Sequence, residues 1–165
     1  MKKIGIVYGS TTGTTEGVAE KIAAKFAGSD MISAGELDEA FVTEHDVLIL
    51  GSSTWGSGEL QDDWYDGVEV LKSADLSGKK VAIFGCGDGS TYSDTFCDAM
   101  GLIYEEIKDK GIELVGKVST AGYSFDSSVS AEEDMFIGLA IDEDNEGNLT
   151  DERIDNWVAQ INAVL

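Results

Sequence analysis

The chain alternates between short apolar runs and stretches of apolar residues at helical spacing, and this alternation limits the possible folds more than any other feature. The apolar runs predict strands over residues 4–8, 30–33, 47–50, 81–84, 112–118 and 136–141. Helical spacing predicts helices over residues 18–26, 64–71, 96–107 and 154–161. Strands that alternate with helices form βαβ units, in which helices cover both faces of a parallel sheet. We therefore predict an α/β protein, a doubly wound three-layer sandwich with five parallel strands.

The length of 165 residues fits a single domain, residues 1–165, which can bury a core without a metal or a disulfide. The formal net charge of −21 argues against nucleic acids and membranes as main partners, because their phosphates require Lys and Arg side chains for neutralisation. Cys86 and Cys97 are far apart and His45 is the only histidine, so we expect reduced thiols, no metal site and a cytoplasmic monomer. No apolar run is long enough for a signal peptide or a membrane span.

The loop after the first predicted strand is rich in hydroxyl groups and leads directly into a predicted helix. It contains Ser10, Thr11, Thr12, Gly13, Thr14 and Thr15. Backbone N–H groups at a helix N-terminus, together with hydroxyl donors, form an anion site. The loop lacks the lysine of a Walker A sequence and does not match GxGxxG. We therefore expect it to bind a phosphate monoester rather than a nucleoside triphosphate with Mg²⁺.

The loops after the third and fourth predicted strands each carry an aromatic side chain among small residues. Trp55 lies within the Ser- and Gly-rich segment 52–58, and Tyr92 ends the glycine-rich segment 85–92. Ligands of doubly wound sheets bind at the carboxyl ends of the strands, so both loops lie at the edge that is expected to hold the phosphate. Two aromatic side chains at this edge can enclose a flat ring.

These three loops resemble the cofactor loops of the flavodoxin family. The segment 10–15 is similar to the loop that binds the FMN phosphate, and the segments 54–55 and 87–94 are similar to the two loops around the isoalloxazine ring. Residues 119–134 resemble the insertion that splits the fifth strand in long-chain flavodoxins, and residues 138–145 resemble the segment after it. The resemblance covers the whole chain. It implies a flavodoxin-like sandwich with strand order 2-1-3-4-5, an insertion in the last strand, and noncovalently bound FMN.

The resemblance also implies which residues bind the cofactor. They are Ser10, Thr11, Thr12, Gly13, Thr14, Thr15, Thr54, Trp55, Gly56, Cys86, Gly87, Asp88, Tyr92, Asp94 and Asp144. The first six hold the phosphate, Trp55 and Tyr92 flank the ring, and the segment 86–88 approaches its pyrimidine edge. Asp144 reaches the ribityl chain, and the carbonyl of Gly56 turns toward the reduced ring. Many long-chain members carry a larger residue where this chain has Gly56.

By the same resemblance, the chain is a low-potential one-electron carrier that shuttles between the semiquinone and hydroquinone states of FMN, and it is not an enzyme. Acidic residues follow both aromatic loops and predict a docking face for basic redox enzymes, such as a ferredoxin/flavodoxin-NADP reductase or a 2-oxoacid oxidoreductase. These acids are Glu59, Asp62, Asp63, Asp66, Asp88, Asp94 and Asp98. The alternative is an FMN-dependent quinone or NAD(P)H reductase on the same fold. That enzyme needs a pocket for a second substrate, and no conspicuous acid–base residue supports one.

Overall fold

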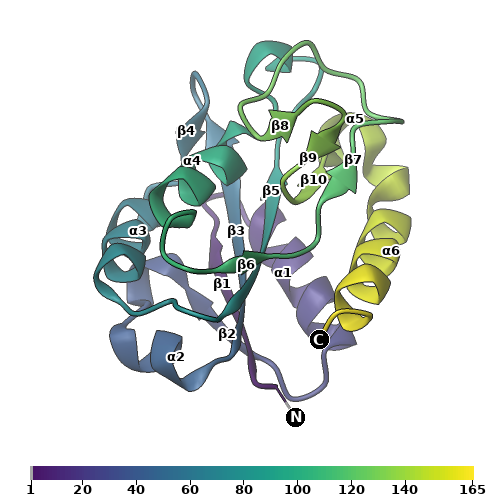
Figure 1. The fold of residues 1–165 in the computed structure, drawn as a ribbon. Coiled ribbons are helices and arrows are strands. Elements are labelled where there is room, and N and C mark those ends of the chain that lie inside the picture. Colours follow the sequence, from purple (N-terminus) through teal and green to yellow (C-terminus); the bar gives the residue numbers. More distant parts are fainter. Residues whose placement is uncertain (1) are drawn as a thin grey trace.

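A parallel sheet forms the centre of the computed structural model, which describes residues 2–165 (Figure 1). Its main strands are adjacent in the order β2–β1–β3–β5–β10. Their bounds are β1 Ile4–Gly9, β2 Asp30–Ser33, β3 Val47–Trp55, β5 Lys80–Cys86 and β10 Leu139–Ile141. Because the two-residue strand β4 (Glu59–Leu60) only pairs antiparallel with the end of β3, β5 is the fourth strand of the parallel sheet. The predicted order 2-1-3-4-5 is therefore confirmed.

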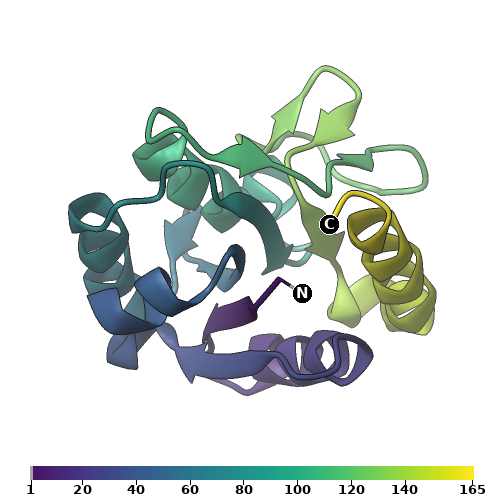
Figure 2. The same ribbon diagram turned by 60° about the horizontal axis from the view of Figure 1, so that its bottom comes forward.

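Helices cover both faces of this sheet, as the two views in Figures 1 and 2 show. The helices are α1 Thr14–Lys25, α2 Glu39–Glu44, α3 Asp63–Ser73, α4 Asp98–Ile107, α5 Glu143–Glu146 and α6 Thr150–Asn162, with short 3₁₀ turns η1 Ala34–Glu36, η2 Ser93–Thr95 and η3 Gly147–Leu149. One apolar core contains residues of α2, α3 and α4, and a second core contains residues of α1 and α6. The three-layer sandwich is therefore confirmed.

The central strand β3 supplies both cores because successive side chains of a strand point to opposite faces. Leu48 and Leu50 lie in the core under α3 and α4, whereas Ile49 lies in the core under α1 and α6. All three side chains are fully buried. A strand that is covered on both faces must be apolar at every position, which explains the uninterrupted run Val47–Leu50.

The fifth position of the sheet is shared by two short segments. β6 (Glu113–Leu114) pairs with the start of β5, and β10 pairs with its end. Between them, residues 115–138 form an insertion that contains a small antiparallel sheet of β7 (Val118–Ser119), β9 (Met135–Phe136) and β8 (Ala131–Glu132). The predicted insertion in the last strand is confirmed.

The predicted strands 112–118 and 136–141 are both shorter in the structure, and a glycine interrupts each of them. Gly116 has φ +84°, so the chain leaves the β5 edge after Val115. At Gly138 the backbone passes so close to β5 that a Cβ atom would lie 1.9 Å from the carbonyl oxygen of Ile83. The apolar residues around both glycines are explained by burial in the two apolar cores rather than by continuous strands.

Other elements also differ from the sequence prediction, and three of them have a clear reason. α4 begins at Asp98 rather than at residue 96, because Cys97 has φ 52° and turns the chain at the helix start. The helix α2 was not predicted, since it has six residues and only one of them, Val42, is buried. The strand β4 was not predicted either, because two residues carry no periodicity.

Cys86 and Cys97 are both free and buried. Within residues 2–165, no group of three His, Cys, Asp or Glu side chains is arranged to hold a metal ion. Over the same range, no helix combines the length and the apolar character that crossing a bilayer requires. The two apolar cores therefore supply the cohesion of the fold.

The close passage at Gly138 generates a stability prediction. We expect Gly138→Ala to lower the free energy of unfolding by about 1–3 kcal/mol, because the added methyl group collides with the backbone of β5. Gly17→Ala is the matched control: Gly17 lies inside α1 with open space around it, so the same change should raise stability by about 0.5–1 kcal/mol. Urea unfolding of both variants measures the effects, and equal stability of the two would contradict the expectation.

Candidate functional site

The register of the sheet brings the carboxyl ends of four strands to one level. Gly9 at the end of β1 is paired with Ser52, and Ser53 is paired with Cys86 at the end of β5. Cys86 is paired in turn with Ile141 at the end of β10. The loops that follow these strands therefore converge at one edge of the sheet, although they are far apart in the sequence.

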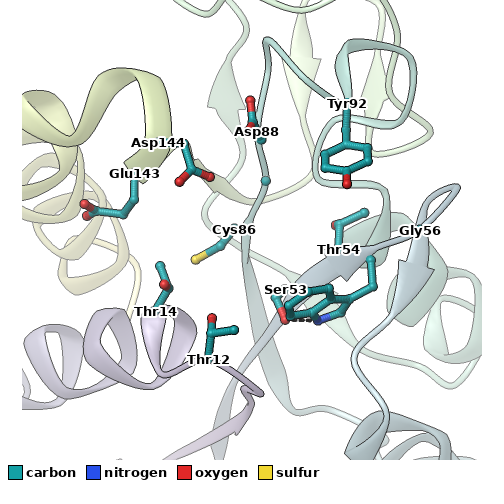
Figure 3. Close-up of a pocket in the computed structure, with 12 residues that line it drawn as sticks. Thr12, Thr14, Ser53, Thr54, Gly56, Cys86, Asp88, Tyr92, Glu143 and Asp144 are labelled. Carbon is teal, nitrogen blue, oxygen red and sulfur yellow. Dashed lines mark hydrogen bonds between the residues drawn. The ribbon is translucent and has the colours of Figure 1, made fainter.

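A single open pocket lies between these loops (Figure 3). Its lining residues are Thr12, Thr14, Ser53, Thr54, Trp55, Gly56, Cys86, Gly87, Asp88, Tyr92, Glu143 and Asp144. All except Ser53 and Glu143 were predicted from the sequence. Ser53 directly precedes the predicted Thr54, and Glu143 directly precedes the predicted Asp144. Their position next to predicted residues was the only sign in the sequence that they line the pocket.

The loop between β1 and α1 holds its hydroxyl groups by local hydrogen bonds. Ser10 Oγ accepts a hydrogen bond from the Gly13 N–H at 3.1 Å, and Gly13 itself has φ +96°. Thr11 Oγ1 accepts a hydrogen bond from Gln61 Nε2 at 3.1 Å, so this side chain is turned away from the pocket toward α3. Thr12 and Thr14 line the pocket, and Figure 3 shows them on the side formed by the start of α1.

Thr15 is the residue of this loop that most clearly calls for a ligand. Its side chain is 0% exposed, and Oγ1 has no well-formed hydrogen-bond partner within residues 2–165, although its interaction with the Cys86 thiol offsets part of the rise in the pKa of that thiol. A buried hydroxyl without a partner costs roughly 1–3 kcal/mol. The hydroxyl lies in the first turn of α1, where free N–H groups favour an anion. The Thr15 hydroxyl and the N–H groups of this first turn therefore fit a phosphate group, whose oxygens would accept hydrogen bonds from them.

Two exposed aromatic side chains reach the pocket from different loops. Trp55 is 39% exposed, and its Nε1 donates a hydrogen bond to Ser53 Oγ at 2.7 Å, which fixes the indole against its own strand. Tyr92 is 51% exposed, and its N–H donates to the carbonyl oxygen of Asp88. Large aromatic side chains are usually buried, so two exposed ones on one pocket are available to cover an apolar ring.

The turn after Trp55 depends on glycine. Gly56 has φ +53° and Gly58 has φ +94°, a region that side-chain-bearing residues enter only with strain. The N–H of Gly58 donates to the carbonyl oxygen of Trp55 at 3.1 Å and closes the turn. The peptide between Gly56 and Ser57 is therefore exposed at the rim of the pocket.

A hydrogen-bond network fixes the loop after β5 to the segment after β10. Asp88 Oδ1 accepts hydrogen bonds from the N–H groups of Ser90 and Thr91, and from Asn145 Nδ2 at 2.8 Å. Asn145 Nδ2 also donates to the buried carboxylate of Asp142. Asp142 Oδ2 in turn accepts the N–H of Gly89 at 3.0 Å. Asn145 therefore joins the two walls of the pocket that carry acidic side chains.

The pocket is acidic and contains no Lys or Arg among its lining residues. Hydrogen bonds from Thr91 and Asn145 lower the pKa of the Asp88 carboxyl. Burial raises the pKa of the Asp144 carboxyl, and repulsion from Asp88 and other nearby carboxylates adds to this rise. Burial raises the pKa of the Cys86 thiol to about 12, so this side chain presents a neutral group. An anion in this pocket would have to be held by neutral donors.

The structure places five predicted site residues outside the pocket lining: Ser10, Thr11, Gly13, Thr15 and Asp94. The first four shape the loop behind Thr12 and Thr14, as described above. Asp94 lies in η2 with its side chain exposed, and its carbonyl oxygen accepts a hydrogen bond from Ser127 of the insertion. Asp94 is therefore not part of the pocket lining, and its role in cofactor binding stays a prediction.

The prediction that Asp98 belongs to an exposed docking face is wrong. Asp98 is only 6% exposed, because the side chain lies between the insertion and the turn at Gly58. The other predicted acids are exposed or partly exposed. His45 lies before the start of β3 at the opposite edge of the sheet, where it is buried and contacts Asp30.

A family model described as Flavodoxin matches residues 6–157 of the sequence. The chain belongs to the flavodoxin family. Its relatives include the flavodoxins of Nostoc sp. strain PCC 7120 and Picosynechococcus sp., each 46% identical to this chain and covering 97% and 98% of it. The alignments cover 95% and 96% of these relatives. Flavodoxins are electron-transfer proteins rather than enzymes, as the sequence predicted.

Solved flavodoxin structures agree with this assignment. The Fusobacterium nucleatum flavodoxin bound to flavin mononucleotide matches with a TM-score of 0.94 and 31% identity, over 100% of this chain and 99% of that one. Oxidised Flavodoxin 2 from Bacillus cereus matches with a TM-score of 0.76 and 29% identity, over 99% of each chain. Both matches extend over nearly the full length of each pair of chains.

The bridging amide of Asn145 can be tested directly. Asn145→Ala should raise the pKa of Asp88 toward the ordinary value of about 3.9, because it removes one of the bonds that favour the carboxylate. A lowered pKa contributes stability that is present above the ordinary value and is lost as the pH falls below it. Through Asp88 the variant should therefore lose about 1 kcal/mol or less of stability at neutral pH and less than that in acid, because Asp88 is partly exposed.

Carboxyl NMR titration measures the pKa, and urea unfolding at several pH values measures the stability. Asn148→Ala is the control, since Asn148 is exposed on the same segment. An unchanged Asp88 pKa in Asn145→Ala would show that the amide does not bind that carboxylate in solution.

Proposed function

We propose that this chain binds FMN noncovalently in the pocket and carries single electrons at low potential, cycling between the semiquinone and hydroquinone states. One observation carries the proposal. A single pocket has the hydroxyl groups of Thr12 and Thr14 at one end and the exposed rings of Trp55 and Tyr92 at the other. The phosphate of FMN suits the first end and its flat ring suits the second. When bound, FMN supplies the ring that takes up and releases electrons.

The phosphate would be held by neutral groups of this chain alone. The start of α1 provides free N–H groups, and Thr12, Thr14 and Thr15 provide hydroxyl donors. Each hydrogen bond to a charged oxygen contributes roughly 1.5–3 kcal/mol, so a few such bonds suffice without a lysine.

The acidic side chains would set the low potential. Asp88, Glu143 and Asp144 all line the pocket. A carboxylate about 10 Å from a developing anion costs roughly 1.7 kcal/mol at an effective dielectric constant of about 20. Three carboxylates on one pocket therefore oppose the addition of a negative charge to a ligand bound in that pocket. The indole of Trp55 and the ring of Tyr92 add to this effect by excluding water.

The exposed acids around the pocket would guide the partner. Glu59, Asp62, Asp66 and Asp94 are exposed on the loops and helix starts beside Trp55 and Tyr92. Carboxylates around an exposed ring edge attract a basic redox enzyme and raise the rate of encounter. We propose a basic reductase or a 2-oxoacid oxidoreductase as the partner class. We also propose a cytoplasmic monomer, supported by two free cysteines in a chain of high net charge.

Steady-state assays separate the carrier from an FMN-dependent reductase. The FMN-loaded protein is mixed with NADH or NADPH and a quinone, with and without an added flavodoxin reductase. A carrier consumes the nucleotide only when the reductase is present. Rapid consumption by the isolated protein would support the enzyme instead.

The Thr15 hydroxyl provides a two-sided test of the phosphate site. Without FMN, Thr15→Val should raise the free energy of unfolding by about 1 kcal/mol, because it removes a buried hydroxyl without a partner. The same change should weaken FMN binding by roughly 10- to 150-fold, because the lost bond to a charged oxygen contributes about 1.5–3 kcal/mol. Riboflavin, which has no phosphate, should bind the variant and the original chain alike.

Fluorescence titration gives the affinities, and Thr43→Val on the exposed face of α2 is the control. An equal loss for FMN and riboflavin would mean that Thr15 does not contact the phosphate.

The docking face generates a kinetic prediction. Asp62→Asn combined with Asp66→Asn should lower the second-order rate constant of electron transfer to a basic reductase by roughly two- to tenfold at low salt. The difference should shrink as salt rises, because the Debye length falls from about 30 Å at 0.01 M to about 8 Å at 0.15 M. Glu39→Gln combined with Glu44→Gln on α2 removes the same charge away from the pocket and should change the rate little. Stopped-flow measurements with equal effects of the two pairs would rule out local steering.

A further inference from the structure

Asp98 is a buried carboxyl that the pocket itself does not use. It is the first residue of α4 and is 6% exposed. Its Oδ1 accepts the N–H of Val129, in the insertion, at 2.9 Å. The insertion is therefore attached to α4 through this side chain.

The other side of the Asp98 carboxyl faces the turn after Trp55. A Cβ atom on Gly58 would lie 2.7 Å from Asp98 Oδ2 and 3.2 Å from Asp98 Cβ. Asp98 thus fills the space that a side chain at residue 58 would need, and Gly58 can approach it only because it has none. At Gly56, by contrast, an added Cβ would meet only the Glu59 side chain.

The first turn of α4 is shared between the pocket and the insertion. The N–H of Ala99 donates to Thr54 Oγ1 at 3.1 Å, immediately before Trp55. The N–H of Gly101 donates to Ser130 Oγ at 2.8 Å, and Ser130 Oγ donates to the carbonyl oxygen of Cys97 at 2.6 Å. The first-turn N–H groups of α4 therefore bind both β3 and the insertion.

We propose that Asp98 is a positioning residue, through which the insertion holds the Trp55–Gly58 turn in the shape that FMN binding requires. The inference rests on the proposed function, because the turn matters only if it lines the cofactor site. The physical reason is conformational entropy. A turn of Gly56, Ser57 and Gly58 has many accessible shapes, and fixing one of them before the ligand arrives saves that cost on binding.

The test compares Asp98→Ala with Asp98→Asn. Asn keeps the acceptor for Val129 and the side-chain atoms that lie against Gly58, whereas Ala removes the acceptor and the carboxyl atoms and keeps only Cβ. In the full chain without FMN, Asp98→Ala should speed hydrogen exchange of the Gly58 N–H by about tenfold, and Asp98→Asn should restore slow exchange. With FMN, Asp98→Ala should weaken affinity by about tenfold and shift the potential of the first one-electron step, and Asp98→Asn should restore the affinity.

Ser130→Ala is the matched control, since it breaks an insertion contact to α4 but leaves the Asp98 carboxyl in place. It should lower stability without changing the exchange of the Gly58 N–H or the FMN affinity. If Asp98→Ala does not fold, Asp98→Ser replaces it, because Ser keeps a polar group at the helix start and removes the atom that meets Gly58.

Unchanged exchange and affinity in Asp98→Ala would overturn the inference, and so would equal losses in Asp98→Ala and Asp98→Asn, which would indicate a charge effect instead. Failure of the original chain to bind FMN would contradict the proposed function. The exchange measurement without FMN would still report on the Asp98 contact, so the two failures are distinguishable.

Discussion

The pairing of β3 with β1 on one side and β5 on the other is the constraint on which the rest of the structure depends. Both pairings are parallel and place Gly9, Ser52, Ser53 and Cys86 at one level. A slip of one residue would exchange the buried faces of β3, because its side chains alternate between two apolar cores. The cores therefore fix the register, and the register fixes where the three loops meet.

The start of α4 is the second fixed point, and it connects segments that the sequence keeps far apart. Thr54 from the end of β3 and Ser130 from the insertion both bind its first-turn N–H groups. Asp98 lies between the same two segments. The insertion therefore does more than cover the edge of β10. The stacking of Phe125 on Phe96 anchors it to the core, and its polar groups bind the start of α4.

Charge is distributed in this chain so that binding and docking use different groups. No basic side chain lines the pocket, and the hydroxyl and N–H groups around α1 are neutral. Carboxylates lie on the walls and outside the rim, where they oppose further negative charge and, under the proposed function, would attract a basic partner. Exposed acids such as Asp62 and Asp66 can act over a Debye length, whereas the buried Asp98 acts only by contact.

The sequence by itself determined the layers, because apolar periodicity is a local property. The composition of the loops is local too, and through its resemblance to known loops it gave the family, the strand order and ten of the residues that line the pocket. Only the tertiary structure decided the rest. It showed that Thr15 is buried without a partner, that Asn145 joins two walls, and that Asp98 faces inward. Whether an acid is exposed depends on what another part of the chain places over it. Residues 128–130 cover Asp98, and no pattern around residue 98 records that contact.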